Sequence, residues 1–223
     1  MTADDVYVLM QFCCNKAQQG YLPPDKFNLV INVGMRSWIS YILGDFQQYR
    51  PGRPIANIEL GNNEVVRQRI APTIYGYILN VNPITGISPY PGDYIQTDTM
   101  YSIYGHKRIR YAENTRLDSM YNSKIDPIAT NPIYLLEDTN FQFYPETIWQ
   151  AKLRYVKDPP DIHWGYTLDG NGRPIYDPST SVDPIFDNTV MLEIIVRSLK
   201  IVGTNLQLEA VMQYANDVKN LGQ

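Results

Sequence analysis

The stretch Leu153-Arg154-Tyr155-Val156-Lys157-Asp158-Pro159-Pro160 divides this chain of 223 residues into two kinds of sequence. Before it lies a region rich in tyrosine and proline, with short runs of Ile, Tyr and Val that are typical of strands joined by turns. After it come a polar loop and a long helical segment. No pattern typical of a reaction centre stands between the two parts. The arrangement therefore favours a protein that works as a component of an assembly.

The region before this stretch predicts a compact, mainly antiparallel β unit over residues 64–165. Its strands are expected in runs rich in β-branched and aromatic residues, at 74–81, 100–104, 107–111, 133–136, 141–144 and 151–157. Asn82-Pro83 and Pro91-Gly92 are turn-forming pairs that separate these runs. Residues 113–121 predict one short helix within the unit.

Apolar residues recur at helical spacing near both ends of the chain. Residues 1–45 predict a hairpin of two helices, which Gly20 separates and Gly44 ends. Residues 183–221 predict a second helix pair: Asp183 caps its first helix, Gly203 ends that helix, and Thr204 with Gln207 caps the next. The sequence thus predicts an α+β fold, in which N- and C-terminal helical hairpins pack as one bundle and the β unit is inserted between them.

Residues 166–182 predict a projecting loop or hairpin. Asp169-Gly170-Asn171-Gly172 lies at its centre, and Asp-Gly and Asn-Gly are strong hairpin-turn signals. The segment is polar and glycine-rich, so we expect it to lie outside the core, and we expect nearby Trp164 to be exposed. Residues 47–57, around Pro51-Gly52-Arg53-Pro54, are expected to form an extended arm.

The composition argues against several functional classes. The net charge of −4 lacks the overall basic footprint of a protein that grips nucleic acid. The sequence has two histidines, His106 and His163, in separate segments, and its two cysteines are the neighbours Cys13 and Cys14. No spacing predicts a catalytic triad, a zinc site or a phosphate-binding loop. We expect no enzyme, no cofactor, no membrane span and no secretory signal.

One basic patch stands out, with Lys107, Arg108 and Arg110 on a run that alternates with Ile109, and with Arg116 nearby. Three interpretations remain open. The patch contacts DNA that passes through a channel, because arginine and lysine bind phosphates. Alternatively, it pairs with an acidic neighbour across a subunit boundary. The third interpretation is an ordinary solvated strand face.

Tyrosine is the compositional outlier, with 18 tyrosines against 6 phenylalanines. Its large apolar ring and hydroxyl suit surfaces that become buried on association, although any β-rich fold with many turns also uses it. A sugar-stacking platform is the alternative use. We expect association surfaces at the tyrosine-rich loops and at the C-terminal tail, with these candidate residues: Tyr90, Tyr94, Trp164, Tyr166, Asn171, Tyr176, Lys219 and Leu221.

Several short sequence segments, in their order along the chain, resemble those of a known family. They are Asn15-Lys16 through Phe27-Asn28, Tyr90-Pro91-Gly92-Asp93-Tyr94, Ser123-Lys124-Ile125-Asp126-Pro127, Phe143-Tyr144-Pro145 and Leu153 through Pro159. From about Asp5 to Leu221 the chain resembles the neck-ring proteins of tailed phages, and most closely those of crAss-like phages of gut Bacteroides-type hosts. The architecture is also similar to head-to-tail adaptors and tail tubular proteins of short-tailed phages.

The resemblance implies a virion structural protein, synthesised in the host cytoplasm and placed in the neck of the virion. It implies a twelve-fold ring between portal and tail, through which the genome passes without sequence-specific contact. The implied partners are other copies of the chain, the portal or an adjacent neck ring, and tail proteins. A host-surface or carbohydrate-binding tail module is the alternative, and an enzyme is a more distant one.

Overall fold

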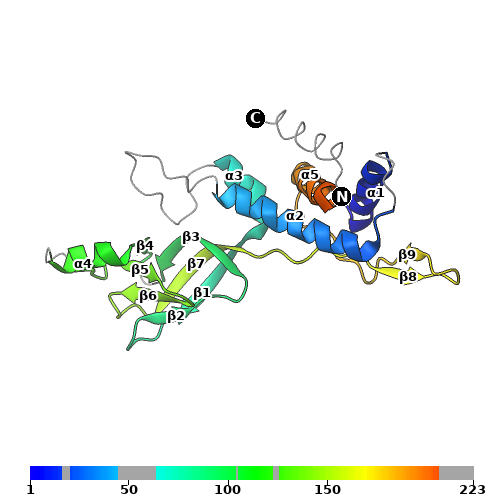
Figure 1. The fold of residues 1–223 in the computed structure, drawn as a ribbon. Coiled ribbons are helices and arrows are strands. Elements are labelled where there is room, and N and C mark those ends of the chain that lie inside the picture. The colour runs from blue at the N-terminus through cyan, green and yellow to red at the C-terminus, as the bar shows by residue number, and fades with distance from the viewer. Residues whose placement is uncertain (17–20, 45–63, 104, 123–125, 206–223) are drawn as a thin grey trace. The chain divides into compact units, whose positions relative to one another are not determined.

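A computed structural model of the chain describes residues 1–16, 21–44, 64–103, 105–122 and 126–205 (Figure 1). The chain divides into two compact units. Residues 1–45 and 159–223 form the helical unit, and residues 46–158 form the β unit. The predicted α+β class is confirmed, since helices and mainly antiparallel sheets occur together. The β unit ends at Asp158, within the stretch Leu153–Pro160, because the segment from Pro159 onward packs with the helices.

The described part of the helical unit contains α1 (Ala3–Lys16), α2 (Pro24–Gly44) and α5 (Asn188–Asn205). The predicted apolar stripe of α2 is buried, and Trp38 on this stripe is fully enclosed. Its indole Nε1 donates a hydrogen bond to Glu193 Oε2 of α5 at 2.8 Å. Tyr7 of α1 meets Phe27 of α2 edge-on, with ring centroids 5.0 Å apart. Side chains on a helical period thus join α2 to both other helices.

Both expected ends of α5 are wrong. The helix begins at Asn188, where Asp187 Oδ1 accepts a hydrogen bond from Val190 N at 2.8 Å. Asp183 Oδ1 instead accepts from Ala3 N at 2.7 Å, so this carboxylate caps α1 across the sequence. The helix also continues through Gly203 to Asn205, because glycine inside a helix costs only about 1 kcal/mol. The expected final helix beyond Asn205 lies outside the described residues.

Helices α2 and α5 lie close together at Gly34. A Cβ atom on Gly34 would lie 2.0 Å from Ser198 Oγ and 3.1 Å from Ser198 Cβ. Ser198 is buried, and its Oγ donates to Ile194 O at 2.9 Å. Space therefore favours glycine here, because a Cβ atom forces the Ser198 hydroxyl to rotate away and α5 to shift slightly.

We expect Gly34→Val to lower the free energy of unfolding by about 2 kcal/mol, because the branched side chain overpacks the α2–α5 contact. Urea denaturation followed by circular dichroism measures this loss. Adding Ser198→Gly to the same chain opens space and should return part of the stability. A Gly34→Val protein that unfolds at the wild-type urea midpoint would contradict the close approach of the two helices.

The described residues of the β unit form two larger sheets. The first has the order β1 (Ile74–Asn80), β7 (Gln150–Lys157), β3 (Tyr94–Ser102), with both pairs antiparallel. The second has the order β2 (Ile87–Pro89), β6 (Asn140–Tyr144), β5 (Ile133–Leu136), β4 (Arg110–Tyr111). In it only β4 and β5 run parallel. Two short helices, α3 (Glu64–Ile70) and α4 (Asn114–Asn122), and the 3₁₀ turn Ala71–Thr73 complete the described part of the unit.

One apolar core joins the two sheets. The stretch that divides the sequence supplies its centre, because Leu153 and Tyr155 of β7 are buried while the alternate residues Lys152 and Arg154 are exposed. The other buried members come from both sheets and their connections: Leu79, Val81, Met100, Ile109, Tyr134, Phe141, Phe143, Ile148 and Ala151. The β unit is thus a packed body with its own core.

The predicted hairpin is confirmed as a third, two-stranded sheet in the helical unit. Strand β8 (Tyr166–Leu168) pairs antiparallel with β9 (Pro174–Tyr176). In the turn, Asp169 Oδ1 accepts hydrogen bonds from the backbone of Asn171 and Arg173, each at 2.8 Å. Gly172 adopts a φ of 76°, which glycine allows without strain. The ribbon extends beyond the N-terminal end of α2 (Figure 1).

Among the described residues, no helix combines the length and the apolar composition that a bilayer crossing requires.

Candidate interaction surfaces

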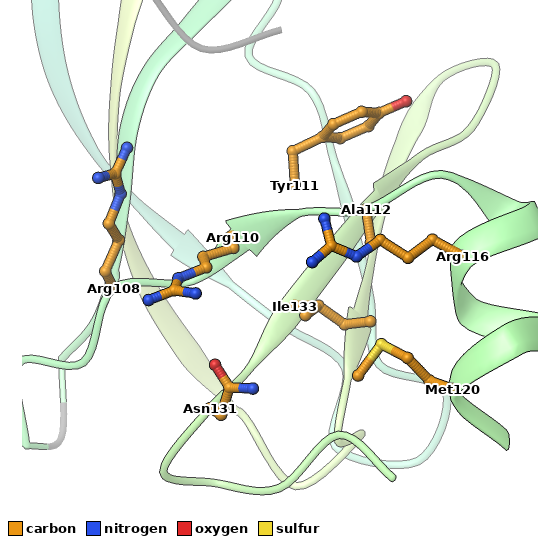
Figure 2. A pocket seen from close by; sticks show the side chains of 8 residues that line it. All are labelled: Arg108, Arg110, Tyr111, Ala112, Arg116, Met120, Asn131 and Ile133. Carbon is orange, nitrogen blue, oxygen red and sulfur yellow. The ribbon is translucent and has the colours of Figure 1, made fainter. Parts of the chain in front are cut away.

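A pocket of about 330 Å³ lies on the second sheet of the β unit, and we call it the arginine pocket (Figure 2). The parallel pairing of β4 with β5 builds it, because this pairing places Arg110 beside Ile133. Helix α4 follows β4 directly and brings Arg116 to the same place. The lining residues are Arg108, Arg110, Tyr111, Ala112, Arg116, Met120, Asn131 and Ile133.

The arginine pocket has a strongly positive lining. Arg108, Arg110 and Arg116 are all exposed, whereas Ile109 between the first two is fully buried, so the predicted alternation is confirmed. Lys107 is exposed too but does not line the pocket. None of the lining residues is acidic, and within the described ranges no carboxylate forms an ion pair with Arg110 or Arg116. Such a cavity is suited to an anionic group.

Burial of the Tyr111 ring raises the pKa of its hydroxyl, and the nearby Glu113 carboxylate raises it further. Tyr111 therefore stays neutral at physiological pH and leaves the positive charge of the pocket to the three arginines. Figure 2 shows Arg116 extending from α4 toward β4, with Met120 of the same helix below it and Asn131 near Arg110.

Trp164 was expected to be exposed, and that expectation is wrong. Its side chain is 4% exposed and stacks on Tyr7 of α1, with ring centroids 4.3 Å apart. Tyr166 and Tyr176 of the hairpin stack on the same indole at 5.9 and 5.7 Å. The indole Nε1 donates to Asp4 Oδ1 at 2.9 Å. The rings therefore form an aromatic stack that fastens the hairpin to the helices, and Trp164 presents little surface to a partner.

The other hairpin candidates lie closer to solvent. Tyr166 and Tyr176 are half-buried in the stack, and Asn171 is exposed at the tip of the turn. Tyr166 Oη donates to Asp25 Oδ1 at 3.2 Å, and the negative charge of Asp25 is the largest cause of the raised pKa of Tyr166. Leu168 and Ile175 are exposed apolar residues of this ribbon that were not among the predicted candidates.

Tyr90 and Tyr94 pack against the core of the β unit. Their rings stack with centroids 4.9 Å apart, and both meet Phe141 edge-on. Tyr90 Oη donates to Glu137 O at 2.6 Å, and Tyr94 Oη shares a 2.8 Å hydrogen bond with Thr97 Oγ1. Both residues are half-buried, so each keeps some surface that is exposed to solvent.

These contacts predict a loss of stability in alkali. Burial raises the pKa of Tyr90 to about 12, with smaller contributions from Tyr94, Glu137 and Asp138. The unfolded state loses this proton near pH 10, so the stabilisation is complete below pH 10 and falls as the pH rises through about 10 to 12. Urea midpoints measured across this range should fall more steeply for wild type than for Tyr90→Phe. Equal slopes would contradict the assignment.

Exposed apolar side chains form two further surfaces that were not among the predicted candidates. On β1, an edge strand, Tyr75, Tyr77 and Ile78 are 50%, 46% and 52% exposed. We call this the β1 edge. In the helical unit, Val8 and Phe12 lie one turn apart on α1, and Leu29 and Val33 lie one turn apart on α2, and all four are exposed. Exposed apolar patches of this kind mark interaction sites.

Three other candidates cannot be placed on these surfaces. Lys219, Leu221 and the expected arm at 47–57 lie outside the described residues. Within the described ranges, no group of His, Cys, Asp and Glu has a geometry suited to a metal ion.

No model of a known protein family matches this chain, and no curated protein shows significant similarity to it.

Proposed function

We propose that this protein is a virion structural protein that forms a homo-oligomeric ring in the neck of a short-tailed, crAss-like phage. The observation that carries the proposal is the exposed apolar surface on both units. Tyr77 and Ile78 on the β1 edge, and Phe12 and Leu29 on the helices, are large apolar side chains that are exposed in the part of the chain that the structure describes. Their burial against other copies gains about 25 cal/mol for each Å² of apolar surface removed from water.

The difference in chemistry between the exposed surfaces also supports a ring. A closed ring needs two different faces on each subunit, because each copy contacts one neighbour with one face and the next neighbour with the other. This chain offers surfaces of different chemistry: an apolar β1 edge, an apolar helical stripe and a positively charged pocket. An edge strand with free backbone groups is in addition a natural site for pairing with another chain.

In the proposed assembly the ring links the portal to the tail and surrounds part of the channel for DNA ejection. In each subunit the N-terminal helical hairpin and the expected C-terminal helix pair form one bundle. The ring contacts the portal or an adjacent neck ring and the tail proteins. The net charge of −4 supports passage of DNA without retention, since an acidic chain has little affinity for phosphates.

Deletion of Asp169–Arg173, the hairpin turn, is expected to leave the fold intact and to weaken assembly. The turn is exposed, and its side-chain hydrogen bonds close within the turn itself, so little core structure depends on it. Circular dichroism and thermal unfolding check the fold, and light scattering during gel filtration measures the assembled mass. Assembly equal to that of wild type would remove the turn from the subunit interface.

Self-association of the purified chain tests the proposed function. Sedimentation velocity over a range of concentrations should show a discrete oligomer that dissociates on dilution. Tyr77→Ser with Ile78→Ser, on the β1 edge, should shift this equilibrium toward the monomer. Val182→Ser, at another exposed apolar position, serves as the control. A wild-type chain that stays monomeric both alone and with its portal would contradict the ring.

A carbohydrate-binding tail module is the second candidate, and one observation favours it. Tyr75 and Tyr77 are exposed aromatic residues two positions apart on one face of β1, and Lys157 Nζ lies 5.5 Å from the Tyr75 ring centroid. Aromatic faces of this kind stack on sugar rings. Binding of the isolated chain to a glycan array, abolished by Tyr75→Ala, would favour this function over the ring.

A further inference from the structure

The two ends of strand β5 carry opposite charge. Asn131 and Ile133, at the start of the strand, line the arginine pocket. Glu137 and Asp138 follow directly after Leu136, which ends the strand, and both are exposed. We call Glu137–Asp138 the acidic turn. Within the described ranges neither of its carboxylates forms an ion pair.

The chemistry of the arginine pocket favours a protein carboxylate over a nucleic acid. A guanidinium group binds a carboxylate through two parallel hydrogen bonds, and three guanidinium groups surround this cavity. The Asn131 amide adds a further donor. Ala112, Met120 and Ile133 add apolar lining, which suits the methylene groups of a glutamate side chain. Phosphate contacts of a nucleic acid position its backbone and do not depend on a pocket with an apolar lining.

The acidic turn is held in a defined shape. Glu137 N donates to Asn140 O at 2.9 Å, and Glu137 O accepts a hydrogen bond from Tyr90 Oη at 2.6 Å. Both backbone polar groups of Glu137 are thus hydrogen-bonded, while the side chains of Glu137 and Asp138 are exposed. A fixed turn loses little conformational entropy when a partner binds it.

The pocket and the turn of one chain are kept apart by the strand between them. Strand β5 has four residues, which span about 13 Å in extended form, and β6 and β4 flank it on either side. The complementary charges therefore meet only between different copies. A site at one end of a strand that binds the other end of the same strand in the next copy makes a head-to-tail, heterologous contact.

We propose that the arginine pocket of one copy binds the acidic turn of the next copy. Arg110 and Arg116 receive the carboxylates of Glu137 and Asp138, and Asn131 adds a hydrogen bond. This contact deepens the proposed ring, because it gives that ring a polarity and a subunit order. It is tested independently of the neck role, since pairing between copies is measured without any phage partner.

The experiment exchanges the two charges in the full chain. The pocket variant carries Arg110→Glu and Arg116→Glu, and the turn variant carries Glu137→Lys and Asp138→Lys. Each variant alone should associate at least about tenfold more weakly than wild type by sedimentation velocity. An equal mixture of the two should regain association, because each pocket then faces a turn of opposite charge. Circular dichroism confirms that both variants are folded.

Matched single changes separate the pocket from general electrostatics. Arg116→Glu and Lys107→Glu alter the charge equally, at exposed positions inside and outside the pocket. Only the first should weaken association. Equal effects of the two, failure of the mixture to recover, or self-association that ignores both charge variants would overturn the inference. Loss of binding to a labelled single-stranded DNA oligonucleotide in the pocket variant, with self-association unchanged, would assign the pocket to nucleic acid instead.

The outcomes also separate this inference from the ring. Open chains or dimers that depend on the pocket and the turn would support the inference and contradict a closed ring. A closed ring that forms in both charge variants would support the ring and overturn the inference.

Discussion

Replacement of Trp164 by alanine is expected to lower the free energy of unfolding of the helical unit by about 4 kcal/mol. The indole is buried, stacks on Tyr7, Tyr166 and Tyr176, and donates to Asp4. Its removal leaves a large cavity where α1 and the hairpin meet. Urea denaturation followed by circular dichroism measures the loss.

Trp149→Ala is the matched control, because this tryptophan is 49% exposed and its loss leaves no comparable cavity. It should cost far less than Trp164→Ala. A Trp164→Ala protein as stable as the control variant would show that the aromatic stack does not fasten the hairpin to the helices.

The second large effect is expected at Asp98, a fully buried carboxylate of the β unit. Arg67 of α3 donates a hydrogen bond to Asp98 Oδ1, and Arg154 Nε lies 4.0 Å from Asp98 Oδ2. Asp98→Ala should destabilise the β unit by about 3 kcal/mol, because it removes the partner of a partly buried guanidinium group. Chemical denaturation monitored by tyrosine fluorescence measures this effect.

A double-mutant cycle isolates the pair. Arg67→Met should also destabilise the protein, because it leaves the Asp98 carboxylate buried without its main partner. The chain with both changes should lose less than the sum of the two single losses. Strict additivity would mean that α3 is not held to the sheet by this ion pair.

The elements with a clear local period could be predicted from the sequence. The bounds of α2, the strand at β7 and the hairpin turn each follow from side-chain spacing or turn chemistry within the segment itself. The start of α5 could not, because Asp183 and Asp187 are equally good caps by type. The choice between them depends on the backbone of Ala3, which is 180 residues away in sequence from Asp183.

The candidate surfaces were predictable only in part, because they too depend on contacts between residues that lie far apart in the sequence. Alternation along residues 107–111 correctly placed Arg108 and Arg110 outside and Ile109 inside. The pocket itself needs the parallel pairing of β4 with β5, which brings Asn131 to the arginines and has no local signal. Exposure of the β1 edge likewise depends on the strand order β1-β7-β3, in which a Tyr- and Ile-rich strand lies at the margin.

At Trp164 the prediction failed in the opposite direction, because a side chain that was expected to be exposed is buried. Its polar, glycine-rich surroundings favoured an exposed position, yet residues before and after it pack inward. Two asparagines of α2 hold this segment. The backbone N–H of Trp164 donates to Asn28 Oδ1, and that of Ile162 donates to Asn32 Oδ1, each at 2.8 Å. A loop whose backbone is hydrogen-bonded to a helix in this way is part of the packed structure.

Negative-stain imaging of the purified protein, alone and mixed with the portal of the same phage, tests the central claim most directly. The proposed role predicts a ring of fixed symmetry, either free or stacked on the portal, with the subunits in a single head-to-tail order. A protein that remains monomeric at high concentration, and that binds neither the portal nor another neck ring, would contradict it.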